Sequence, residues 1–160
     1  MSSRHGPPHG PFRYALPIDV RFRDTDAMGH VNNAVYLTYF ESARAGYYRV
    51  VTGRSFAAAT ENPHSIILAH ARVEFRSPAF FGESLFVGCR VSWASRTSFG
   101  MEYSITSGDG PLGSGRAVAD GGTVQVMFDY AANRPLRLPA ELLAQLAEFE
   151  GHEIPARPGR

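Results

Sequence analysis

Hydrophobic and polar residues alternate along five stretches of the chain. The first stretch, residues 14–22, places an apolar side chain at every second position, which is the period of a strand with one buried face. Four further stretches, separated by breaks rich in Gly, Pro or Ser, cover residues 67–75, 85–93, 99–105 and 117–128. The pattern therefore predicts five strands, with the last four forming an antiparallel meander.

Two other stretches follow the period of a helix. Apolar residues recur at helical spacing from Tyr36 to about residue 51, and the remaining surface of this segment is also largely apolar. We expect this helix to begin near Asn32 or Asn33, which are good N-cap residues, and to end near Gly53. Residues 139–150 predict a short final helix with one apolar stripe. The order strand, long helix, four strands and short helix predicts an α+β domain in which a curled sheet buries the long helix.

Two details of the strands carry further expectations. Pro17 suits an edge strand, so we expect the sheet to extend through the sheet of a partner chain. In the last strand, the apolar positions change from odd to even numbers across Gly121 and Gly122, which predicts a β-bulge at this pair.

The composition indicates one folded domain. A chain of 160 residues with 44% apolar residues has room for a single core. Residues 1–12 and 151–160 are broken by Pro and Gly, so we expect flexible tails on either side of a domain at 13–150. No stretch is long and apolar enough to span a membrane or to act as a signal peptide, and we therefore expect a cytoplasmic protein with no membrane partner.

Charge and residue types exclude several kinds of chemistry. The net charge is +1 and the Arg residues are spread along the chain, so a nucleic acid is not an expected partner. All 16 basic residues are Arg, and without Lys neither a Schiff base nor a P-loop lysine is possible. Cys89, the single cysteine, lies in an alternating stretch and is expected to be a buried structural residue.

The densest group of polar residues is the segment 24–33, DTDAMGHVNN, between the first strand and the long helix. Its functional groups are two carboxylates, an imidazole and two amides, on Asp24, Asp26, His30, Asn32 and Asn33. A helix N-terminus offers unpaired N–H groups that can polarise a carbonyl oxygen. Turn formation alone would also explain the Asp and Asn residues. The spacing does not match a standard metal site, so no metal is expected.

The sequence VRFRDTDAMGHVNNAVYLTYFESAR resembles the signature of the 4-hydroxybenzoyl-CoA thioesterase-like branch of the hotdog superfamily. The resemblance continues more loosely through HARVEFRSPAFFGESLFVGCRVSWASRTSFGMEYSI and GRAVADGGTVQVMFDYAANRPLRLP, and so covers residues 14 to about 139. It implies a hotdog fold, in which a five-stranded antiparallel sheet wraps around a long central helix. It also implies a homodimer or homotetramer with active sites between subunits. The expected activity is hydrolysis of an acyl-CoA thioester, with no cofactor because coenzyme A is part of the substrate.

The same resemblance assigns roles to residues. Asp26 is expected to be the nucleophile or general base, and the backbone amide of Asn33, seven residues later, is expected to polarise the thioester carbonyl. His30 would orient water or form a hydrogen bond near the carboxylate, although a plain loop His would also explain it. Independently of the resemblance, the turn-forming tendency of Asp indicates that Asp24 caps or braces the loop. Substrate contacts are expected from further positions, among them an acyl pocket of aromatic residues and a phosphate contact at the turn 95–98. The side chains concerned are those of Asn32, Tyr36, Tyr39, Phe40, Phe81, Arg96 and Ser98, together with the other hydroxyls of that turn.

Several alternatives stay open. Glu41 on the long helix is a rival catalytic carboxylate, although an ion pair with Arg44 or a link to a strand Arg would also explain it. The HVNN segment is similar to plant acyl-carrier-protein thioesterases, although Met28 stands where those enzymes have Asn. A non-catalytic module that binds acyl-CoA or an acyl carrier, and a hotdog dehydratase, are further alternatives.

Overall fold

The computed structural model describes residues 12–54, 64–108 and 115–159. Its elements, in chain order, are β1 (Tyr14–Asp19), a short 3-10 helix η1 (Phe22–Asp24), α1 (Val35–Thr52), β2 (His64–Phe75), β3 (Ser84–Ala94), β4 (Ser98–Ser107), β5 (Ala117–Asp129), β6 (Arg134–Pro135) and α2 (Ala140–Glu150). The two predicted helices and five predicted strands are all present, and β6 is an additional short strand.

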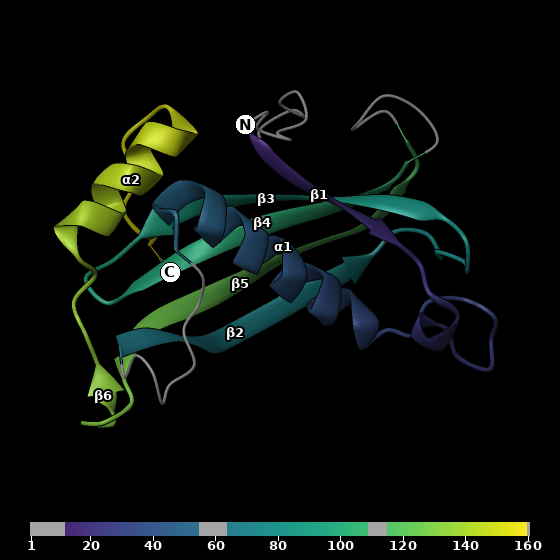
Figure 1. The fold of residues 1–160 in the computed structure, drawn as a ribbon, viewed down its shortest axis with the longest axis horizontal. Helices are drawn as coiled ribbons and strands as arrows, with labels where there is room; N and C mark the ends of the chain where they lie inside the picture. The colour runs from purple at the N-terminus through teal and green to yellow at the C-terminus, as the bar shows by residue number, and fades with distance from the viewer. Residues whose placement is uncertain (1–11, 55–63, 109–114, 160) are drawn as a thin grey trace.

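The strands form one antiparallel sheet in the order β1-β3-β4-β5-β2, with β6 paired to β5. The sheet curls around α1, which lies along one face, and α2 covers the end where α1 finishes (Figure 1). The prediction of a hotdog-type α+β fold is therefore confirmed. The meander holds only for β3, β4 and β5, because β2 pairs with β5 at the far edge and not with β3.

The ends of the first two elements differ from prediction. β1 stops at Asp19, and Phe22 lies in the 3-10 turn with 76% of its surface exposed. The N-cap of α1 is Ala34, not Asn32 or Asn33, although the Asn32 side chain accepts a hydrogen bond from Ala34 N at 3.0 Å. The C-terminus is as predicted: Gly53 adopts φ 72° and its N–H binds Arg49 O.

The face of the sheet that meets α1 forms the core. Leu85, Val87, Cys89 and Val91 on β3 are at most 1% exposed and alternate with outward residues. Burial raises the pKa of the Cys89 thiol well above its ordinary value, which suits an inert core residue. The prediction that Cys89 is structural is thus confirmed.

The bulge predicted at Gly121 and Gly122 is wrong, and β5 shifts its register against β4 nearer its start, between Ala117 and Ala119. Gly121 and Gly122 pair in continuous register with both neighbouring strands, and the register shifts of the sheet lie elsewhere. A side chain at Gly121 would overlap the Phe40 ring, so the odd-numbered residues of β5 from Ala119 to Met127 face α1. This places Thr123 and Gln125 inside the domain, where they are 3% and 1% exposed.

The edges of the sheet and the C-terminal tail complete the fold. β1 is an edge strand, as Pro17 predicted, and β2 is the other edge. The expectation of a flexible tail at 151–160 differs from the structure, in which Ala94 N donates to Pro155 O at 2.9 Å and Arg157 stacks 4.7 Å from the Trp93 ring. The predicted N-terminal tail at 1–12 lies, except for residue 12, outside the described residues.

Candidate active site

Asp24 braces the loop between β1 and α1. It is 3% exposed and accepts hydrogen bonds from Arg21 N, Nε and Nη2 at 2.9–3.2 Å and from Tyr39 OH at 3.0 Å. Burial alone would raise the pKa of Asp24, but the hydrogen bonds from Arg21 and Tyr39 outweigh burial and hold the pKa below its ordinary value. Asp24 therefore fixes the loop to the helix, as the sequence predicted.

Asp26 begins a tight turn in the same loop. Its carbonyl oxygen accepts a hydrogen bond from Gly29 N at 3.0 Å, and its carboxylate oxygen Oδ1 accepts one from Met28 N at 2.9 Å. Gly29 has φ 83°, a conformation that favours glycine. The carboxylate is half-buried and makes no other hydrogen bond to the described part of the chain, so one of its oxygens stays free.

Asn32 and Asn33 connect this loop to α1 in different ways. Asn32 is held by both backbone groups, since its N–H binds Asp24 O at 2.9 Å and its carbonyl oxygen accepts from Val35 N at 2.9 Å. The backbone N–H of Asn33 makes no hydrogen bond with any residue that the structure describes. The N-terminus of α1 thus presents a free N–H group at the position that the sequence predicted.

A cavity of about 240 Å³ opens beside Asn33. It brings together three of the predicted site residues, His30, Asn33 and Tyr36, with a wall that follows β2. The residues that line it are His30, Val31, Asn33, Tyr36, Phe75, Arg76, Ser77 and Pro78. Asp26 does not line it, but Asp26 N donates a hydrogen bond to the carbonyl of His30, which does.

The residues of the cavity wall at 75–78 were not predicted. Tyr36 meets Phe75 edge-on at 5.2 Å between ring centroids, and Arg76 binds Asp120 at 3.0 Å and Glu74 at 2.9 Å. Burial raises the pKa of Tyr36, so its hydroxyl stays neutral. The FRSP segment stood within the stretch that resembles the family, but only the packing of the end of β2 against α1 assigns it to the cavity.

Three of the predicted acyl-pocket residues lie away from this cavity. Tyr39 is bound to Asp24, and burial together with that hydrogen bond raises its pKa. Phe40 is fully buried and stacked on Tyr103 at 4.4 Å, so it belongs to the core. Phe81 is 62% exposed and contacts Phe22 at 5.8 Å.

The predicted phosphate contact lies at the opposite end of the sheet. Arg96 O accepts from Leu138 N at 2.8 Å, and Ser98 Oγ lies 2.6 Å from Ser95 Oγ. The turn at 95–98 adjoins Met127, whereas the cavity wall adjoins Val118, nine residues earlier on β5. Nine strand residues span roughly 30 Å, so this turn does not meet the cavity of its own chain.

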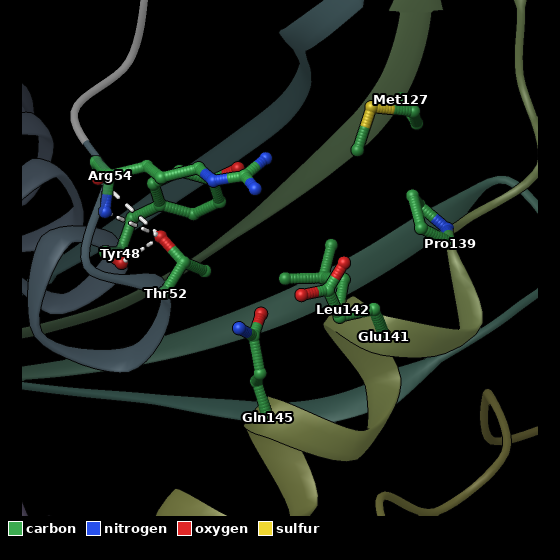
Figure 2. Close-up of a pocket in the computed structure, with 8 residues that line it drawn as sticks. All are labelled: Tyr48, Thr52, Arg54, Met127, Pro139, Glu141, Leu142 and Gln145. Atoms are coloured by element: carbon green, nitrogen blue, oxygen red, sulfur yellow. Dashed lines mark hydrogen bonds between the residues drawn. The ribbon is translucent and has the colours of Figure 1, made fainter.

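Two further features are outside the cavity. Glu41 is exposed, and no ion pair joins it to Arg44 or to a strand Arg among the residues described. A second cavity, of about 70 Å³, lies where α1 ends, between Tyr48, Thr52 and the start of α2 (Figure 2). It contains none of the predicted site residues.

The described residues contain neither a metal cluster nor a membrane helix. Within the described ranges, no group of three His, Cys, Asp or Glu side chains is arranged to hold a metal ion. None of the described helices has the length and hydropathy of a membrane span.

Comparisons with known proteins identify the family. The profile of the thioesterase-like superfamily matches residues 20–146, so the chain belongs to this superfamily. Together with the curled sheet around α1, this match defines a hotdog-fold thioester hydrolase of the acyl-CoA thioesterase family.

Individual relatives agree with this assignment. A thioesterase of Thermus thermophilus, solved with coenzyme A and Zn, superposes with a TM-score of 0.72 and 33% identity over 93% of this chain and 97% of that one. The long-chain acyl-CoA thioesterase FadM of Escherichia coli is 27% identical over 132 residues, which are 82% of this chain and 96% of FadM. A 1,4-dihydroxy-2-naphthoyl-CoA thioesterase of Synechocystis shares the fold, with a TM-score of 0.75, 21% identity and coverage of 84% and 95%.

Proposed function

We propose that this chain hydrolyses acyl-CoA thioesters, with Asp26 as nucleophile or general base and the backbone N–H of Asn33 polarising the thioester carbonyl. The main support for the proposal is the free backbone N–H of Asn33, a residue that lies just before α1 and lines a cavity. A donor of this kind stabilises the oxyanion that forms when a carbonyl is attacked.

The chemistry needs few groups, because a thiolate is a good leaving group. In one route, Asp26 attacks the carbonyl carbon, the C–S bond breaks with release of the thiolate, and water opens the resulting acyl anhydride. In the other route, Asp26 takes a proton from the water that attacks. His30 lines the cavity, and in this proposal it orients the water. No cofactor beyond the coenzyme A of the substrate takes part.

The cavity suits the acyl side of the substrate. Tyr36 and Phe75 supply an apolar wall next to Asn33, which favours an acyl group over a polar one at this point. FadM acts on long-chain acyl-CoA by its name, and a relative from Arabidopsis thaliana, 22% identical over 85% of this chain and 68% of its own length, is an acyl-acyl carrier protein thioesterase. A carrier-bound acyl group is therefore the alternative substrate.

We further propose that two chains pair through β2 to form a dimer, in the cytoplasm. β2 is a 12-residue edge strand with exposed apolar side chains: Ile67 is 39%, Leu68 48% and Phe75 53% exposed. A long apolar edge of this kind is normally covered by another strand. Phe75 ends β2 and residues 76–78 follow it directly, so the partner strand would border the cavity and complete its wall. A second chain is also required if Arg96 and Ser98 are to contact the coenzyme.

The test is thiol release from acyl-CoA and acyl-carrier substrates by the wild type, Asp26→Asn and the control Asp19→Asn. Asp19 is an exposed carboxylate on β1, so its replacement controls for loss of a nearby negative charge. Asp26→Asn should lower kcat by at least about a hundredfold, whereas Asp19→Asn should not. Equal activity of Asp26→Asn and wild type would rule out the assigned role.

A second pair of variants tests the backbone donor. Asn33→Pro removes the N–H group, and a proline is tolerated just before or at the start of a helix. Asn33→Ala keeps the N–H group and removes only the side chain. The proline variant should lose about a hundredfold more kcat than the alanine variant at a similar melting temperature. Equal loss in both variants would move the role to the Asn33 side chain.

A further inference from the structure

Four polar side chains form a connected group on the face of the sheet that α1 covers. Arg44 Nη1 donates to Tyr103 OH at 3.2 Å, and Tyr103 OH lies 2.8 Å from Thr123 Oγ1. Gln125 Nε2 donates to the same Thr123 oxygen at 2.7 Å. The group joins the middle of α1 to β4 and β5 and will be called the Arg44–Gln125 cluster.

Among the residues described, two members of this cluster lack a polar partner that burial normally requires: Arg44 lacks a counter-ion, and Gln125 Oε1 lacks a hydrogen-bond donor. Arg44 is only 9% exposed, and no carboxylate in the described part of the chain forms an ion pair with it. Gln125 is 1% exposed, and its Oε1 is the only buried side-chain oxygen or nitrogen within 12–54, 64–108 and 115–159 that has no hydrogen-bond partner. A buried cation without a counter-ion and a buried acceptor without a hydrogen-bond donor both destabilise a fold. Their presence points to a ligand that supplies what the chain does not.

The cluster lies beside an apolar strip that starts at the cavity. On β2, the residues opposite Thr123 and Gln125 are Ala71 and Leu68, and α1 packs mainly against β1 and β3. Leu68 is therefore 48% exposed, and Phe75, at the cavity end of the same strand, is 53% exposed. An acyl chain that enters at Phe75 and follows β2 passes the Arg44–Gln125 cluster one strand away, at about 5 Å.

The far end of the strip meets the second cavity. Met127, the next inward residue of β5 after Gln125, lies at the small cavity with Tyr48 and Leu142 (Figure 2). Arg44 follows Asn33 by 11 residues, which is about 16 Å along a helix, and helical side chains lean back toward the N-terminus. The distance between the carbonyl site and the cluster thus matches an acyl chain of medium length.

We propose that Arg44 and Gln125 bind a hydroxyl group carried on the acyl chain, and that the protein prefers acyl thioesters hydroxylated far from the carbonyl. The proposal rests on the thioesterase function proposed above and names its substrate class. A hydroxyl can accept a hydrogen bond from the Arg44 guanidinium and donate one to Gln125 Oε1, so a single group would serve as partner to both residues. An unsubstituted alkyl chain would form neither hydrogen bond.

The test compares ω-hydroxydecanoyl-CoA with decanoyl-CoA. The wild type should show a kcat/KM ratio of at least about ten in favour of the hydroxylated substrate, since a hydrogen bond to a charged group discriminates more strongly than a neutral one. Arg44→Met and Gln125→Leu should each bring the ratio close to one. Arg49→Met, which removes an exposed Arg from the same helix, should keep the wild-type ratio. A wild-type ratio near one, or a ratio unaffected by both cluster variants, would overturn the proposal.

A second measurement separates this proposal from the proposed function. The melting temperature of the wild type is measured with decanoic acid and with ω-hydroxydecanoic acid, which need no turnover. Stabilisation by the hydroxy acid that is lost in Arg44→Met supports the cluster site even if no thioester is hydrolysed. If decanoyl-CoA is hydrolysed but the hydroxylated substrate is not preferred, the proposed thioesterase function is supported and the proposed hydroxyl-binding site is contradicted. If Arg44→Met dissociates into monomers while the kcat/KM ratio of the two substrates stays at the wild-type value, the proposal is contradicted, and the role of Arg44 is contact with a second copy of the chain.

Discussion

The two flanks of α1 are built differently. On the β3 side, Leu85, Val87, Cys89 and Val91 form a dry, fully buried apolar surface. On the β5 and β2 side, the buried positions include Thr123 and Gln125, and the edge strand beyond them stays partly exposed.

The contrast separates stability from binding. Close apolar packing fixes the position of α1, and with it the site loop at its N-terminus. Buried polar groups and an open apolar strip lower stability, and such features persist where a ligand or partner makes use of them. The β5 and β2 side is therefore where we place substrate and partner contacts.

The largest expected effect tests the difference between the two flanks directly. Leu85→Ala, on the packed side, should lower the free energy of unfolding by about 2–5 kcal/mol because it leaves a cavity. Leu68→Ala, on the open side, should cost well under about 1 kcal/mol in the monomer, since this side chain is 48% exposed. Urea unfolding of both variants at a concentration where the protein is monomeric measures the difference. Equal costs would show that Leu68 is buried in solution.

The next effect concerns Asp24, which ties the site loop to α1 through Tyr39. Asp24→Asn should cost about 2 kcal/mol at neutral pH, because hydrogen bonds to a carboxylate are stronger than those to an amide. The pKa of Asp24 is lowered in the folded state, so its contribution is complete above the unfolded value and is lost as the pH falls toward the folded value. Unfolding midpoints between about pH 6 and about pH 3 should fall more steeply for wild type than for Asp24→Asn. Parallel curves would contradict the assigned pKa direction.

A smaller effect compares the two faces of β5 at neighbouring glycines. Gly121→Ala should destabilise the fold by about 1–3 kcal/mol, because its new methyl group would overlap Phe40 and lie 2.5 Å from Arg72 O. Gly122→Ala faces outward, and its methyl group would meet the movable Arg72 side chain at 3.2 Å. Thermal unfolding of the two variants should therefore place Gly121→Ala clearly below Gly122→Ala. The reverse order would mean that Gly122, and not Gly121, lies on the face of β5 that packs against α1.

The smallest expected effect has the opposite sign. Gln125→Leu removes the buried Oε1 that lacks a partner, so it should stabilise the ligand-free protein by about 1 kcal/mol. The measurement is the melting temperature of wild type and variant without ligand. Destabilisation would show that the hydrogen bond from Gln125 Nε2 to Thr123, which the variant also removes, outweighs the cost of the unpaired Oε1.

Much of the site could be predicted because its groups are close in sequence. The loop at 24–33 combines carboxylates with the start of a helix, and the structure keeps Asp24 as a brace and frees the N–H of Asn33. The cavity wall at 75–78 could not be predicted, since nothing in its sequence says which helix the end of β2 meets. The turn at 95–98 was placed with the site by resemblance, although in a single chain it lies at the far end of the sheet.

The sequence by itself determined the number, kind and approximate limits of the main elements, because alternation and helical spacing are local properties of the chain. Only the tertiary structure decided that β2 crosses to pair with β5, since alternation identifies the buried face of a strand but not its neighbour. It also decided that Gln125, and not Val124 or Val126, faces α1. The apolar side chains at 124 and 126 predicted the opposite facing, because a pattern assumes that apolar residues face the core. Here continuous pairing with β4 along residues 119–126 fixed the register, and Thr123 and Gln125 lie inside the domain as a result.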